Sequence, residues 1–67
     1  RQGLSLVTRR EREVLALIAR GATNAEIARE MVIADTTVKT HISSLLSKLA
    51  ARDRVALVLL AQKAGIA

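Results

Sequence analysis

The 67-residue sequence contains no cysteine, no proline and no phenylalanine, tyrosine or tryptophan, and it has a single histidine. Without cysteine the chain forms no disulfide, and one histidine does not supply the ligands of a structural zinc site. Proteins that hold single-stranded nucleic acid usually stack its bases on aromatic side chains, so RRM-like and OB-like folds are excluded. Stability must therefore come from the packing of secondary structure, helped by a second subunit if one binds.

Long apolar segments and signal-peptide patterns are absent as well. The longest uninterrupted apolar run is Val55–Ala61, whereas about 20 residues are needed to span a bilayer. We therefore expect a cytoplasmic protein with no membrane partner. Because the chain starts at Arg1 and not at methionine, we also expect it to be a fragment of a longer protein.

Acidic residues are few relative to basic ones. The 11 lysines and arginines outnumber the 6 aspartates and glutamates and give a net charge of +5. A net positive charge produces a positive electrostatic potential, which attracts polyanions, either nucleic acid or anionic lipid. A basic domain whose charge serves only solubility is the alternative. The short length and the 51% of hydrophobic residues predict a single domain, 1–67, with one small core.

Capping motifs and apolar periodicity predict four helices. Thr8–Glu11 and Thr23–Glu26 both have the form of a capping box, in which a threonine hydroxyl and a glutamate carboxylate each accept an amide proton. Asp35 and Asp53 are suitable N-caps for two further helices. Apolar residues recur at helical spacing after each cap. The expected fold class is all-α, with helices at about 9–20, 24–31, 36–50 and 54–64.

The middle two helices are predicted to be joined by the short segment Val32–Ala34. A short helix, a tight turn and a longer helix with a free outer face are typical of a helix-turn-helix unit, whose second helix can enter the major groove of DNA. The stretch from Thr36 to Arg52 contains no acidic residue and is the most uniformly positive part of the chain. An ordinary helical hairpin in a small bundle remains the alternative on this pattern alone.

Several separately spaced motifs resemble the LuxR-type helix-turn-helix domain. They are Leu6–Leu15, Thr23–Ala28, Thr37–Ile42, Lys48-Leu49 and Arg52–Arg54. Within that group the chain is most similar to the C-terminal output domain of NarL/FixJ-type response regulators, although quorum-sensing activators and large ATP-dependent activators carry similar domains. The resemblance implies a four-helix domain of a bacterial transcription regulator that binds double-stranded DNA as a homodimer. RNA polymerase is a further candidate partner.

The resemblance also implies which residues approach DNA. Residues expected to contact bases are Lys39, Thr40, Ser43 and Thr36. A lysine can donate to guanine, and a threonine can offer its methyl group to thymine or its hydroxyl to a base edge. Residues expected to contact phosphates are Thr37, Lys48, Thr23 and Asn24, the last two at a helix N-terminus, where the dipole favours anions. The alternatives are a solvated Lys48 and a Thr23 that serves only as a cap. The arginines that flank the first helix are expected to be solvated.

The chain departs from the family pattern after Lys48-Leu49. Many family members have glycine or asparagine there, whereas this chain has Ala50-Ala51. We therefore expect the third predicted helix to run on to about Arg52 before the chain turns.

The last predicted helix is apolar around more than one face, whereas a helix that covers a small core needs only one apolar stripe. Leu57, Val58 and Ala61 are expected to face the core. A second stripe is left over and marks an interface. The expected dimer interface consists of Val55, Leu59 and Gln62. The alternative is that this helix lies in a deeper groove of the core.

The sequence shows no catalytic constellation. The capping role of Glu11 and Glu26 leaves no carboxylate pair for acid-base chemistry, and no base accompanies the serines. His41 has no second histidine or cysteine beside it and is expected to be a packed or hydrogen-bonded structural residue. We therefore expect no enzyme activity, no cofactor and no metal. The rival hypothesis is a helical protein-interaction module that pairs through the last helix and has no role on DNA.

Overall fold

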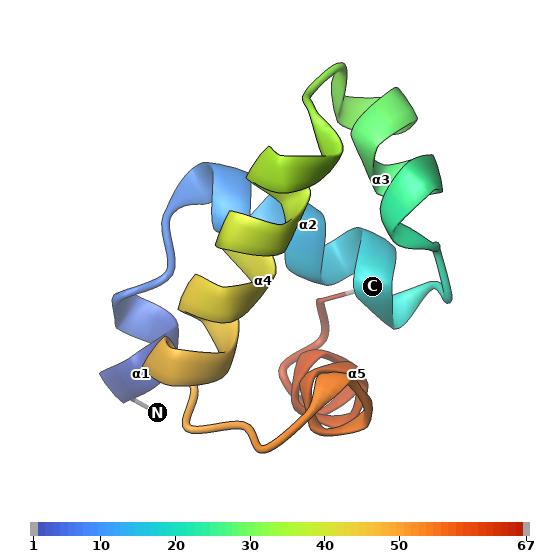
Figure 1. Cartoon of the computed structure of the whole chain (residues 1–67). Helices are drawn as coiled ribbons and strands as arrows, with labels where there is room; N and C mark the ends of the chain where they lie inside the picture. Colours follow the sequence, from blue (N-terminus) through green and yellow to red (C-terminus); the bar gives the residue numbers. More distant parts are fainter. Residues whose placement is uncertain (1, 67) are drawn as a thin grey trace.

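The computed structural model describes residues 2–66, and this part of the chain contains five α-helices and no strand (Figure 1). The helices are α1 (Gln2–Ser5), α2 (Arg9–Ala19), α3 (Asn24–Met31), α4 (Asp35–Lys48) and α5 (Arg54–Lys63). The expected all-α class is confirmed. The four longer helices differ from the expected bounds by at most two residues at either end, and α1 is an additional short helix. None of the helices in the described range has the length and apolar character needed to cross a membrane.

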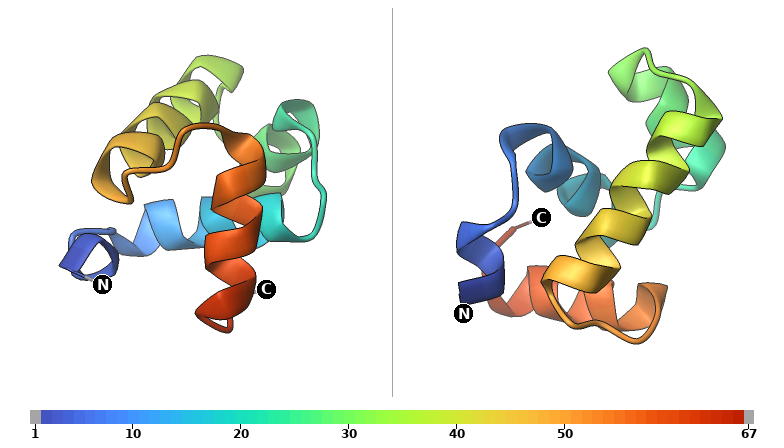
Figure 2. Two further views of the ribbon diagram at one scale, coloured as in Figure 1. Left: turned by 90° about the horizontal axis from the view of Figure 1, so that it is seen from below. Right: turned by 60° about the vertical axis from the view of Figure 1, so that its left-hand side comes forward.

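Helix α2 lies at the centre of the fold. α3, α4 and α5 all pack against it, and α4 also packs against α3 and α5 (Figure 2). The hydrophobic core between them consists of Val14, Leu15, Ile18, Ile27, Ala28, Val38, Leu45, Leu57, Ala61 and Ile66. Burial of a side chain of the size of leucine contributes about 1.5–3 kcal/mol, so this cluster supplies the main stabilising force. Ile66 closes the core from beyond the end of α5.

Helix α1 packs against the C-terminal end of α4. Gly3 approaches this end so closely that a Cβ atom at residue 3 would lie 2.5 Å from the carbonyl oxygen of Lys48. Only glycine permits this approach, since real Cβ contacts of that length do not occur. Helix α1 has too few residues to show apolar periodicity, which is why no pattern in the sequence predicts it.

The predicted caps are present at three of the four longer helices. Both capping boxes form: the Thr8 and Thr23 hydroxyls accept from the amides of Glu11 and Glu26, and the two glutamates accept in return from the threonine amides. Asp53 caps α5 by accepting from the amide of Ala56 at 2.9 Å.

The prediction that Asp35 is an N-cap is wrong. The N-cap of α4 is Ala34, which makes no side-chain hydrogen bond, and Asp35 is the first residue inside the helix. The reason lies in the tight turn before α4, where Val32 adopts a left-handed conformation and the Ile33 amide donates to Ala28 O. This turn places Ala34 at the last extended position. The carboxylate of Asp35 still lies in the first turn, where its negative charge interacts favourably with the positive end of the helix dipole.

The prediction that α4 continues to about Arg52 is also wrong. Helix α4 ends at Lys48, and Ala50 has a left-handed backbone with φ 52. The amides of Ala50 and Ala51 donate back to Ser47 O and Leu46 O, which is the hydrogen-bond pattern of a Schellman motif. Leu49 and Ala51 pack against the core, and this packing offsets the cost of a left-handed alanine.

Val32 adopts a backbone conformation that is unfavourable for its residue type. It is a β-branched residue with φ 56, and its side chain is 88% exposed, so little packing compensates the strain. We expect Val32→Gly to raise the free energy of unfolding by about 0.5–1 kcal/mol. Glycine removes the penalty of the left-handed conformation, but it also increases the conformational entropy of the unfolded chain, which cancels part of this gain. Urea unfolding followed by circular dichroism measures this. A Val32→Gly protein no more stable than Val32→Ala, which keeps a Cβ, would contradict the explanation.

Candidate nucleic-acid interface

Helices α3 and α4 form a helix-turn-helix unit whose outer face is carried by α4 (Figure 1). On the inner side of α4, Val38 and Leu45 are fully buried. The residues expected to contact bases all lie exposed on the other side, and they are Thr36, Lys39, Thr40 and Ser43. Their spacing of three and four residues places them on one helical face. The structure therefore brings the four expected base-contacting residues together on a single accessible surface.

The polar groups of this face differ in what they can offer. The Thr40 hydroxyl donates to Thr36 O at 3.0 Å, so its oxygen is left as an acceptor and its methyl group as an apolar contact. No hydrogen bond or ion pair engages Lys39 within the described part of the chain. Its ammonium group is therefore available to acceptors such as those on guanine.

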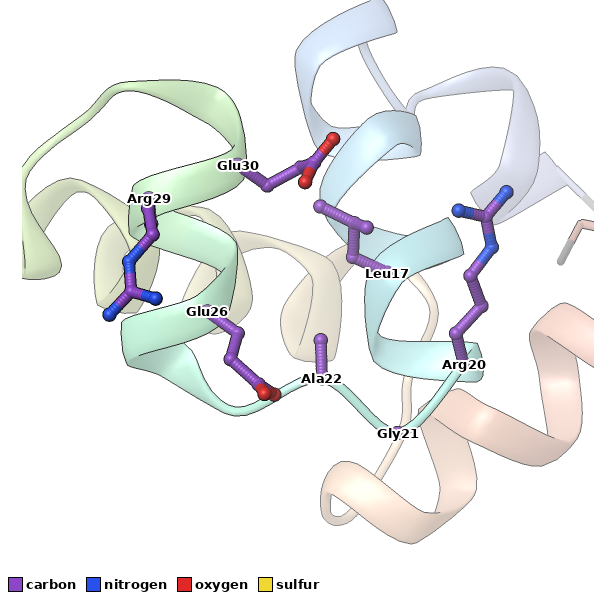
Figure 3. Close-up of a pocket in the computed structure, with 7 residues that line it drawn as sticks. All are labelled: Leu17, Arg20, Gly21, Ala22, Glu26, Arg29 and Glu30. Carbon is purple, nitrogen blue, oxygen red and sulfur yellow. The ribbon is translucent and has the colours of Figure 1, made fainter.

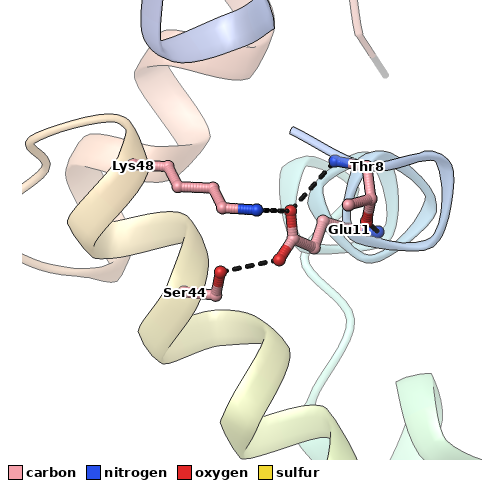
Figure 4. A network of polar contacts seen from close by, with 4 residues as sticks. All are labelled: Thr8, Glu11, Ser44 and Lys48. Atoms are coloured by element: carbon pink, nitrogen blue, oxygen red, sulfur yellow. Dashed lines mark hydrogen bonds and ion pairs between the residues drawn. The ribbon is translucent and has the colours of Figure 1, made fainter. Parts of the chain in front are cut away.

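Lys48 does not behave as a solvated surface lysine. Its Nζ donates to Glu11 Oε1 at 2.8 Å, and its side chain is 29% exposed (Figure 4). The Ser44 hydroxyl donates to the other oxygen of the same carboxylate at 2.6 Å. The Thr8 amide adds a third hydrogen bond, at 3.0 Å. The residues Thr8, Glu11, Ser44 and Lys48, here called the Glu11 cluster, thus join the start of α2 to the second half of α4.

The Glu11 carboxylate is charged in spite of its burial. Burial alone would raise its pKa, but the hydrogen bonds from Lys48, Ser44 and the Thr8 amide, together with the Lys48 charge, lower the pKa from 4.5 to about 2. Throughout the described range no buried side-chain nitrogen or oxygen lacks a hydrogen-bond partner. The Glu11 cluster is therefore a fully satisfied, ionised network. Its role as a cap, which the sequence predicts, is only part of what Glu11 does.

The start of α3 is held by a second polar contact. Arg54, the first residue of α5, donates from its guanidinium group to Asn24 Oδ1 at 2.5 Å and to Ala22 O at 2.6 Å. Asn24 is half-buried, whereas Thr23 is exposed and serves as the helix cap. Because Asn24 Oδ1 is occupied, the amide nitrogen of its side chain is the group left to donate outward. No pattern in the sequence predicts this contact, since Arg54 and Asn24 lie 30 residues apart.

A second accessible surface lies on α5. Leu57 and Ala61 are fully buried, whereas Val55, Leu59 and Gln62 are exposed, Leu59 by 56%. This exposure rules out the alternative in which α5 lies in a deep groove. An open groove between the end of α4 and α5 continues the same apolar surface, and it is lined by Leu49, Ala50, Ala51, Arg52, Ala56, Leu59, Leu60, Gln62 and Lys63.

A shallow depression between α2 and α3 is lined by Leu17, Arg20, Gly21, Ala22, Glu26, Arg29 and Glu30 (Figure 3). The Glu26 carboxylate in it is already engaged by the Thr23 amide. His41 is half-buried on α4. Within the described range, no group of three or more histidine, cysteine or acidic residues is placed to hold a metal ion.

Comparison with known proteins gives consistent matches. The sequence model described as bacterial regulatory proteins, luxR family, matches residues 5–61. The uncharacterized transcriptional regulatory protein YhcZ of Bacillus subtilis is 51% identical over 57 residues, which cover 85% of this chain and 27% of that protein. The transcriptional regulatory protein LiaR of Bacillus subtilis is 56% identical over 48 residues, which cover 72% of this chain and 23% of that protein. The response regulator protein VraR of Staphylococcus aureus is 50% identical over 56 residues, which cover 84% of this chain and 27% of that protein. The chain spans about a quarter of the length of these curated relatives.

Proposed function

Because the chain belongs to the luxR family of bacterial regulatory proteins, we propose that it binds double-stranded DNA with sequence specificity and serves as the output domain of a longer response regulator in a two-component system. The observation that carries this proposal is the exposed face of α4, on which Lys39 has no partner within residues 2–66 and short polar side chains surround it. The names of the relatives, a response regulator protein among them, favour the response-regulator class over quorum-sensing and ATP-dependent activators.

The dimensions and chemistry of α4 suit the major groove. A helix with its side chains is about 10–12 Å across, and the major groove is about 12 Å wide. The short side chains of Thr36, Thr40 and Ser43 let the helix approach the base edges closely. Lys39 donates to guanine O6 or N7, and Thr40 offers a methyl group to thymine and an acceptor oxygen to adenine or cytosine amino groups. These four residues are the proposed base contacts.

Phosphate contacts would fix the register of α4 in the groove. The proposed residues are Thr23 and Asn24 at the start of α3, and Thr37 and Lys48 on α4. Lys48 uses one of its three N–H groups on Glu11 and is partly exposed, so further donors remain for a phosphate. Asn24 has its carbonyl oxygen on Arg54 and its amide nitrogen left as a donor. Such contacts position the protein without reading sequence.

We also propose that two copies pair through Val55, Leu59 and Gln62 on α5, which would place two α4 helices on half-sites about one helical turn apart. Contact with RNA polymerase at the promoter and a location in the bacterial cytoplasm follow from the same role. Binding and not catalysis is the proposed activity. A protein-interaction module without a role on DNA would leave unexplained why the exposed residues of α4 after Asp35 include a lysine and no acidic side chain.

The exchange of Lys39 tests the proposed base contacts. We expect Lys39→Ala to weaken binding to a preferred half-site by about 1–3 kcal/mol and to relax the preference at one base position, since a lysine donor to guanine is lost. The measurement is fluorescence anisotropy with half-site duplexes in which each base pair is varied in turn. Lys63→Ala, which removes the same charge from α5, is the matched control. An unchanged base preference in Lys39→Ala would remove Lys39 from the base contacts.

A further inference from the structure

The Glu11 cluster contains a buried carboxylate to which the proposed function gives no role, although Lys48 of the same cluster is a proposed phosphate contact. Glu11 is only 6% exposed, and it is the buried charged residue among residues 2–66. It belongs to α2, yet two of its three hydrogen-bond partners, Ser44 and Lys48, belong to α4 (Figure 4). A capping glutamate needs neither of them, because its capping bond goes to the Thr8 amide. The cluster therefore has a second task that concerns α4.

The position of the cluster on α4 indicates that task. Ser44 and Lys48 are four residues apart and lie on one flank of the helix. Ser44 follows Ser43 directly and is therefore rotated from it by about 100° around the helix axis. The flank thus lies between the buried side, which holds Leu45, and the exposed side, which holds Lys39 and Ser43.

Apolar and polar contacts constrain α4 differently. The packing of Val38 and Leu45 into the core holds the helix against α2, but the hydrophobic effect has no direction. Hydrogen bonds have a narrow range of distance and angle. The bonds from Ser44 and Lys48 to one fixed carboxylate therefore resist rotation of α4 about its own axis, and they do so over two points one turn apart.

We propose that Glu11 is a positioning residue that fixes the rotation of α4 and thereby the base selectivity of the chain. This inference rests on the proposed function of α4 as the helix that enters the major groove. At a helix radius of about 5–6 Å, a rotation of about 20° moves a surface group by about 2 Å. N–H···O hydrogen bonds have donor–acceptor distances of about 2.7–3.2 Å, a range only about 0.5 Å wide. A displacement of about 2 Å therefore breaks such a bond. Contacts of Lys39 and Thr40 with bases are therefore sensitive to the cluster, whereas long-range attraction to phosphates is not.

The ionised state of Glu11 supports this role. Replacing a buried ion pair by well-packed apolar residues is often neutral or stabilising, so stability alone gives little reason to bury a charge between α2 and α4. The low pKa of Glu11 keeps the carboxylate charged over the whole neutral range. Both oxygens then act as acceptors toward α4 at once, which a neutral side chain of the same size does not offer.

The test separates base selectivity from DNA binding in general. The unmodified chain first selects its preferred duplex from a random library. Dissociation constants for this duplex and for a random duplex are then measured at one salt concentration for the unmodified chain, Ser44→Ala, Glu11→Gln and Glu13→Gln. Ser44→Ala removes one bond of the cluster and leaves the Glu11–Lys48 pair in place. Glu13→Gln removes a charge from an exposed pair on the same helix and is the control. All measurements are made at a temperature at which circular dichroism shows each protein folded.

We expect the ratio of the two dissociation constants to fall by about five- to tenfold in Ser44→Ala and Glu11→Gln and to stay unchanged in Glu13→Gln. Binding of the random duplex is expected to stay within about twofold for all four proteins. A ratio that stays constant in both cluster variants overturns the inference, whether their binding is intact or is reduced equally on both duplexes. If the unmodified chain itself binds neither duplex, the proposed function fails, and this outcome is distinct from a failure of Glu11 to act on selectivity.

Discussion

Replacing Glu11 by alanine is expected to lower the free energy of unfolding by about 3–5 kcal/mol, because the change leaves the Lys48 ammonium, the Ser44 hydroxyl and the Thr8 amide without their common acceptor. A domain of this length without disulfide or metal has a total stability of only about 3–5 kcal/mol. The variant should therefore be largely unfolded at room temperature. Thermal unfolding followed by circular dichroism measures the effect.

The control for this prediction is Glu13→Ala on the same helix. Glu13 pairs with Arg10 at 3.1 Å, but both side chains are exposed, and such a pair contributes only about 0.2–0.5 kcal/mol. The two variants lose the same charge and the same number of atoms. Equal stability of Glu11→Ala and Glu13→Ala would show that the Glu11 cluster does not hold α2 and α4 together.

The Glu11 cluster also predicts how stability depends on pH. The folded-state pKa of about 2 lies below the ordinary value of 4.5, so the unfolded chain binds the proton more tightly. The stabilisation is complete above pH 4.5 and is lost as the pH falls from there to about 2. The difference between these pKa values corresponds to about 3 kcal/mol. Urea unfolding at a series of pH values should show this loss in the unmodified chain. A stability that stays constant below pH 4.5 would contradict the low pKa.

The second large effect concerns the exposed stripe of α5. Leu59→Asp is expected to leave the fold intact, since Leu59 is 56% exposed, and to abolish cooperative occupancy of paired half-sites. A carboxylate at this position would be buried without a partner in the dimer, which opposes association. Analytical ultracentrifugation gives the oligomeric state, and binding to duplexes with one or two half-sites gives the cooperativity.

The chain provides a matched control for the α5 experiment. Leu6 has nearly the same exposure, 59%, but follows α1 and is not part of α5. Leu6→Asp should therefore pair and bind like the unmodified chain. Retained pairing in Leu59→Asp, or an equal loss in Leu6→Asp, would move the interface away from the α5 stripe.

Local patterns predicted the longer helices because their signals are short-range. Each capping box lies within four residues, and the apolar stripes of α2 and α4 repeat within a turn or two. The two wrong predictions also concern local geometry, at Asp35 and at the end of α4. There the left-handed residues are Val32 and Ala50, types that rarely adopt this conformation, so composition gives no warning.

The polar contacts that organise the interface could not be predicted from the sequence, for a different reason. Glu11 meets Ser44 and Lys48 across more than 30 residues of sequence, and Arg54 meets Asn24 across a similar separation. Such pairs depend on how the helices pack, and no periodicity or spacing encodes them. The spacing of Ser44 and Lys48 indicates only that both lie on one flank of α4, and it does not identify Glu11 as their partner.

Binding of duplex DNA as a function of salt tests the central claim most directly. We expect the chain to bind duplex at low salt and to lose affinity linearly on a plot of log K against log salt concentration, with a slope of about −0.9 for each phosphate that a lysine or arginine neutralises. Among the four proposed phosphate contacts only Lys48 is cationic, so these contacts predict a slope of about −1 for each bound protomer, and every further basic side chain that reaches a phosphate makes the slope steeper by about the same amount. Fluorescence anisotropy with the selected duplex and a random duplex measures both affinity and slope. Absence of binding to either duplex at low salt, or binding that does not change with salt, would contradict the proposed function.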